Sequence, residues 1–323
     1  MSAFTTAQVA SLDSSDFNAL TTSQFAALTS AQVAAITSTQ ADTITTSDVA
    51  AISASALRTL STAALAVLDS AQFNALGTDQ FAALTSAQVA AISSTQTDNI
   101  TTDDLAAITT ASLRALSTDA LAALDSAQIG ALTNPQVSAL ATGQVASLNS
   151  ADFNALTTSQ FAALTSMQAA AITSAQTDTI TTDDLAALST SAVRGLTSNA
   201  LSALDSAQIG ALTTLQVAAL TTRQLSGLDS SDFNALTTSQ FAALTSTQVA
   251  AITSDQADTI TTSDIAAISA AGIRSLGTAA LAVLIQHSST RFPPPNLRRS
   301  LRAKLRPSPA RNSTTSPPTT SPR

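Results

Sequence analysis

The sequence contains no cysteine, tryptophan, tyrosine or glutamate, and aromatic residues make up only 3% of its 323 residues. Without cysteine there is no disulfide bond, thiolate metal site or cysteine nucleophile. His287 is the only histidine, so neither a Ser-His-Asp triad nor a histidine metal cluster can be assembled. No stretch approaches the ~18 consecutive apolar residues of a transmembrane helix. We therefore expect no catalytic residues, no cofactor, no metal ligands and no membrane span.

What the chain has instead is an internal repeat. From Phe4 to Val283 it divides into thirty-five octapeptides (octads) without an insertion or deletion, for example LTTSQFAA from Leu20 to Ala27. Position one is Leu or Ile in all octads but the first, and position two is Thr, Ser, Asp or Asn in all but three. Position five is Gln or Asp in 27 of 35 octads, position six is usually a large apolar residue, and positions seven and eight are mostly Ala.

This order of residues is typical of a helix start. A Thr, Ser or Asp at the N-cap accepts a hydrogen bond from a free backbone N–H, and the Gln or Asp three residues later reaches back to the cap, which forms a capping box. The apolar residues at positions one and six then pack as a hydrophobic staple. Thr21 with Gln24, and Leu20 with Phe25, form one such set. Pro135 falls at the second helical position, where its missing N–H has no intrahelical partner anyway.

The repeat therefore predicts an all-α solenoid of very short capped helices, one per octad, over residues 1–284. One continuous helix is excluded, because eight residues advance it by ~800°, so the apolar stripe would wind around the helix. A β-solenoid would explain the Thr content, but two Ala per octad and the capping boxes argue against strands. Such short helices are stable only when stacked on their neighbours. Phe pairs such as Phe17 with Phe25, and Phe153 with Phe161, are expected in the core.

Longer blocks of seven octads begin at Leu12, Leu68, Leu148 and Leu228, with three further octads after the second and third. In each block an Arg follows an Asp by sixteen residues. If two octads make one coil, each pair stacks as an exposed ion pair, which contributes only ~0–1 kcal/mol. The extra three octads favour three octads per coil, so the coil size stays open. The predicted structural ion pairs are Asp42 with Arg58, Asp98 with Arg114, Asp178 with Arg194, and Asp258 with Arg274.

Two groups of acidic residues suggest calcium as an alternative ligand: Asp98, Asp103 and Asp104, and Asp178, Asp183 and Asp184. They lack the Asp-x-Asp-x-Asp-Gly spacing and the terminal Glu of an EF-hand loop. Asp is also favoured in the first turn of a helix by the helix macrodipole. We therefore interpret these residues as solvated capping carboxylates.

The repeat ends abruptly after Leu284. Residues 285–323 carry eight basic residues and no acidic one, whereas the repeats carry five Arg and 21 Asp. A basic tail can bind nucleic acid or a membrane surface, but the genetic code favours a frameshift. Removing the G of GAT from CTC GAT TCA GCA CAG TTC AAC GCG CTT gives codons for Leu284 to Arg291 and the start of Phe292. We therefore predict that 285–323 is a frameshifted, disordered continuation of the repeat, with no nucleic-acid partner.

The Leu-Thr-x-x-Gln-Val-x-Ala unit over residues 4–284 resembles octapeptide-repeat proteins of bacterial genomes. The resemblance implies a surface or secreted protein, although Met1 to Phe4 show no signal peptide. We expect a non-enzymatic structural or interaction protein: a rod, spacer or adhesin-like segment that binds a protein or surface partner. The alternative is a ligand-binding module that uses Asp patches for calcium or Thr rows for ice.

The frameshift is tested by the coding DNA. Adding one base near codon 285 is expected to restore an octad reading frame that continues to the end of the known sequence. Sequencing the locus checks this directly. A restored frame without octads, or one interrupted by stop codons, would contradict the interpretation.

Overall fold

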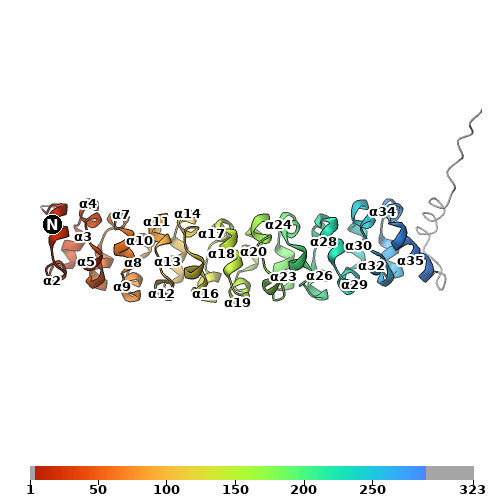
Figure 1. The fold of residues 1–323 in the computed structure, drawn as a ribbon, viewed down its shortest axis with the longest axis horizontal. Helices are drawn as coiled ribbons and strands as arrows, with labels where there is room; N and C mark the ends of the chain where they lie inside the picture. Colours follow the sequence, from red (N-terminus) through yellow and green to blue (C-terminus); the bar gives the residue numbers. More distant parts are fainter. Residues whose placement is uncertain (1–3, 289–323) are drawn as a thin grey trace, which may run out of the picture. The chain divides into compact units, whose positions relative to one another are not determined.

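The computed structural model describes residues 4–288. These residues form thirty-five α-helices and no β-strand, as the repeat predicts. The chain divides into two compact units, which we call unit 1 (Met1–Leu228) and unit 2 (Asp229–Arg323). In unit 1 the helices follow one another in chain order along one direction (Figure 1). The predicted tail falls in unit 2, and residues 289–323 lie outside the described residues.

Each octad gives one helix. The helices of unit 1 are α1 (Thr6–Ser11), α2 (Ser14–Asn18), α3 (Thr22–Ala26), α4 (Ser30–Ala34), α5 (Ser38–Thr43), α6 (Thr46–Ala51), α7 (Ala54–Leu57), α8 (Thr62–Ala66), α9 (Ser70–Asn74), α10 (Thr78–Ala83), α11 (Ser86–Ala90), α12 (Ser94–Thr97), α13 (Thr102–Ala107), α14 (Thr110–Leu113), α15 (Thr118–Ala122), α16 (Ser126–Gly130), α17 (Asn134–Ala139), α18 (Thr142–Ser147), α19 (Ser150–Asn154), α20 (Thr158–Ala163), α21 (Ser166–Ala169), α22 (Ser174–Thr177), α23 (Thr182–Ala187), α24 (Thr190–Gly195), α25 (Ser198–Leu201), α26 (Ser206–Ala211), α27 (Thr214–Ala219) and α28 (Thr222–Gly227). Those of unit 2 are α29 (Ser230–Asn234), α30 (Thr238–Ala243), α31 (Ser246–Ala250), α32 (Ser254–Thr259), α33 (Thr262–Ala267), α34 (Ala270–Ser275) and α35 (Thr278–Ser288).

Most described helices begin at an N-cap side chain, and many of these form the predicted capping box, whereas others, such as α7 and α24, have the N-cap bond alone. In α11 the backbone N–H of Thr85 donates to Oε1 of Gln88 at 2.9 Å, and the N–H of Gln88 donates to Oγ1 of Thr85 at 3.3 Å. The predicted box of Thr21 and Gln24 is also present, and Pro135 lies in the first turn of α17. Each box satisfies N–H groups that a short helix otherwise leaves without a partner.

Three octads make one coil of the stack. The extensive helix–helix contacts join helices three apart in chain order, such as α4 with α7, α7 with α10 and α21 with α24 in unit 1, and α31 with α34 in unit 2. The hypothesis of two octads per coil is therefore wrong. Unit 1 consists of three columns, which we name after their first members: the first column starts at α1, the second at α2 and the third at α3.

The core is built from positions one and six of the octads. In α20 and the loop before it, Leu156 and Phe161 are 3% and 0% exposed. The predicted Phe pairs meet edge to face, with ring centroids 5.1 Å apart for Phe17 and Phe25 and 5.2 Å apart for Phe153 and Phe161. Burying such side chains stabilises the stack by about 1.5–3 kcal/mol each, which offsets the poor intrinsic stability of five-residue helices.

The position-five glutamines join neighbouring coils. Besides its capping role, Gln88 donates from Nε2 to the carbonyl oxygens of Leu57 at 2.8 Å and Leu60 at 3.0 Å. Leu57 is the last residue of α7, and its carbonyl also accepts from the Leu60 N–H at 3.0 Å; Leu60 lies in the loop that leads to α8. One buried amide therefore closes the start of α11 and the end of α7. Equivalent bonds are made in unit 1 by Gln40, Gln80, Gln96, Gln128, Gln136, Gln144, Gln168, Gln176, Gln208, Gln216 and Gln224.

The last described helix passes the end of the repeat. α35 continues from Thr278 to Ser288, so residues 285–288 are helical, although the tail was expected to be disordered from 285 onwards. The octad pattern would place an N-cap residue at 285, where the chain has Ile285. Because no polar cap side chain starts a new helix there, the preceding helix runs on.

Adjacent coils approach very closely at Gly195, the last residue of α24. A Cβ atom at this position would lie 2.2 Å from the carbonyl oxygen of Ser166 at the start of α21. Real Cβ atoms do not come that close to an oxygen, so any side chain here forces the backbones apart. Gly143 at α18 has no heavy atom within 4 Å of the equivalent Cβ. A side chain therefore has space at Gly143 but not at Gly195.

The glutamine bridge is tested by Gln88→Glu. The new carboxylate oxygen faces two carbonyl oxygens without a donor, so we expect the free energy of unfolding to fall by about 3 kcal/mol. Urea unfolding followed by far-ultraviolet circular dichroism measures this. Gln8→Glu is the matched control, because exposed Gln8 makes the capping box alone. Its effect should stay within about 0.5 kcal/mol. Equal effects of both substitutions would contradict the bridge.

The close approach is tested by Gly195→Ala and Gly143→Ala, measured by the same unfolding experiment. Gly195→Ala is expected to destabilise the chain by about 1–3 kcal/mol, because the coils must separate. Gly143→Ala should leave stability unchanged or raise it by up to about 1 kcal/mol, since alanine is the better helix former. A neutral Gly195→Ala would show that the coils are not in contact there.

Candidate functional site

The position-five carboxylates are structural groups. Asp104 is only 7% exposed. Its Oδ1 accepts a hydrogen bond from Thr78 Oγ1 in the preceding coil at 2.8 Å, and its Oδ2 accepts one from Thr101 Oγ1 at 2.6 Å. The same arrangement of two donors per carboxylate holds Asp48, Asp152 and Asp184 in unit 1 and Asp264 in unit 2. At these five positions Asp replaces Gln, and the hydrogen bond between coils has the opposite direction. The position-five side chain is then the acceptor, and a hydroxyl 26 residues earlier in the chain is the donor.

The acidic groups considered for calcium do not converge. Asp98 ends α12, whereas Asp103 and Asp104 lie in the first turn of α13, and Asp104 is occupied by its two threonines. Across residues 4–288, no three acidic or histidine side chains lie close enough to hold a metal ion. The structure thus gives the calcium alternative no ligand set among these residues.

The Asp and Arg residues predicted to pair are exposed and lie on different columns. Asp42 lies in α5 of the second column, whereas Arg58 caps α7 of the first. Asp98 and Arg114 are at the ends of α12 and α14, and Asp178 and Arg194 are at the ends of α22 and α24. In unit 2, Asp258 lies in α32 and Arg274 in α34, where Arg274 Nε donates to the Ala270 carbonyl at 3.1 Å. With three octads per coil, two residues sixteen apart in the chain lie on different columns. The predicted ion pairs therefore lose the stacking on which the prediction was based, and their pairing stays a prediction.

Many Thr and Ser hydroxyls at positions two and three bond the protein, whereas those at position four are exposed. Position-two hydroxyls cap their own helices, as in Thr85. Position-three hydroxyls reach the next coil: Ser30 Oγ donates to the Ser55 carbonyl at 3.4 Å, and Ser150 Oγ to the Ala175 carbonyl at 2.8 Å. Hydroxyls engaged in this way do not form the free, outward array that the ice-binding alternative requires.

Position four of the octad is the position that points into solvent. It is exposed in all thirty-five octads and holds Ala, Ser, Thr, Asp, Asn, Gly or Pro in all but three. The exceptions are Met167, Leu215 and Arg223. Met167 and Leu215 are 72% and 73% exposed, the highest values among the exposed large apolar residues of the described chain. Met167 and Leu215 lie two coils apart in the third column of unit 1, on α21 and α27, and Arg223 lies on α28 in the first column.

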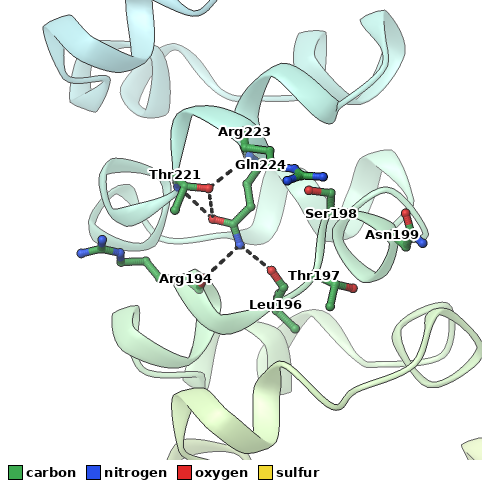
Figure 2. Close-up of a pocket in the computed structure, with 8 residues that line it drawn as sticks. All are labelled: Arg194, Leu196, Thr197, Ser198, Asn199, Thr221, Arg223 and Gln224. Carbon is green, nitrogen blue, oxygen red and sulfur yellow. Dashed lines mark hydrogen bonds between the residues drawn. The ribbon is translucent and has the colours of Figure 1, made fainter.

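A polar groove lies beside Arg223, one of these exceptions. It has a volume of about 390 Å³ and runs between the starts of α25 and α28 (Figure 2). Its polar lining comes from Arg194, Thr197, Ser198, Asn199, Thr221 and Arg223. Figure 2 shows the Arg223 side chain reaching toward Ser198, while Gln224 beneath it bonds the carbonyls of Arg194 at 3.4 Å and Leu196 at 2.8 Å. Within residues 4–288 the Ser198 hydroxyl makes no hydrogen bond, unlike its equivalents Ser30 and Ser150.

An equivalent groove elsewhere in unit 1 has the opposite charge. It lies between α7 and α10, has a volume of about 470 Å³, and is lined by small residues and Asp79. Asp79 occupies the same octad position as Arg223, and Ala50 the same position as Arg194. Sequence reasoning did not single out Met167, Leu215 or Arg223. Their signal was a large side chain at an octad position that is otherwise small or acidic.

No helix among the described residues has the length and apolar character needed to cross a membrane.

Comparison with known proteins identifies the repeat. The family model described as the ALTTAQ repeat matches residues 1–30, 9–46, 41–78, 49–86, 65–94, 97–134, 177–214, 213–246 and 225–262, which together cover more than half of the chain. No curated protein matches the chain.

Proposed function

Because the chain belongs to the ALTTAQ repeat family, we propose that it is a non-enzymatic structural and interaction protein: a spacer whose length is set by its number of coils and whose outward positions bind a protein or surface partner. The proposal includes the surface or secreted setting that the resemblance to bacterial octapeptide-repeat proteins implies.

The glutamine bridge is the observation that carries this proposal. Because Gln88 and its equivalents use the same two carbonyl acceptors in coil after coil, each coil is held to the previous one in the same way. Stability then accumulates from contacts between neighbours, as in other repeat proteins. The exposed position-four side chains make no such pair of bonds to backbone carbonyls of another coil, and across coils Ser159 bonds only the Asn134 side chain at 3.5 Å, so this position can change without loss of the bridge. These are the properties of a spacer with a variable surface.

The bonding of the polar side chains supports a non-enzymatic role. Asp104 and Thr101 bond each other, and Thr85 and Gln88 bond the backbone. A nucleophile or general base needs a side chain that is free to react. The Thr, Ser and Asp residues at positions two and five mostly close helix ends or join coils.

The spacer proposal is tested by removing one coil between two labels. Because the chain has no cysteine, Ser47→Cys and Ser191→Cys place dyes at position four of the third column in unit 1. Deleting residues 84–107, which are three octads, should bring the dyes about 8–10 Å closer, the distance between packed helices. Single-molecule energy transfer measures the change.

Deleting residues 12–35 is the matched control, because this coil lies outside the labelled interval and should leave the dye distance unchanged. Circular dichroism should show that both deletions stay helical. An unchanged distance after the 84–107 deletion, or loss of helix on removing one whole coil, would contradict the spacer proposal.

A further inference from the structure

We draw no further inference here: the strongest candidate, the face of the first coil (α1, α2 and α3) on which the amide nitrogens of Gln8 and Gln24 make no hydrogen bond within residues 4–288, carries no proposal, because nothing in the structure shows what covers it.

Discussion

One amide side chain holds this architecture together. A helix of five residues cannot satisfy its own terminal N–H and C=O groups, and a chain of such helices would expose several of them per octad. The position-five glutamine serves both a helix start and a helix end, because Oε1 of Gln88 accepts from the cap of α11 while Nε2 donates to the carbonyl of Leu57, the last residue of α7, and to that of Leu60 in the loop after it. The bridge also favours glutamine over glutamate at position five. Glutamate could form the capping box, but it has no donor for the carbonyls.

The local structure could be predicted because the interactions that determine it are all made within one octad. The N-cap, its box and the apolar staple lie in one octad, so Thr21, Gln24 and Phe25 were correctly assigned from sequence. The size of the coil could not be predicted, because it depends on contacts between residues about 24 apart, and all octads look alike at that distance. The second role of glutamine was missed for the same reason. Its acceptors lie 28 and 31 residues away.

The unusual position-four residues were not predicted, because the sequence prediction rested on residues that recur from octad to octad. Asp and Arg residues were noticed since they recur in every block, yet Asp42 and Arg58 proved to lie on different columns. Met167, Leu215 and Arg223 do not recur, and only the exposure of position four shows that their size is unrelated to packing. In a repeat protein the regular residues describe the fold, whereas departures at exposed positions are not required by it.

The long blocks and the three-octad coil do not share a common period. Blocks that begin at Leu12, Leu68 and Leu148 place their first helices, α2, α9 and α19, on the second, third and first columns of unit 1 in turn. The same motif in successive blocks therefore lies one third of a turn further around unit 1. A motif that recurs in every block cannot form a straight stripe of identical sites. Instead, each of the three sides of unit 1 carries a different copy of that motif.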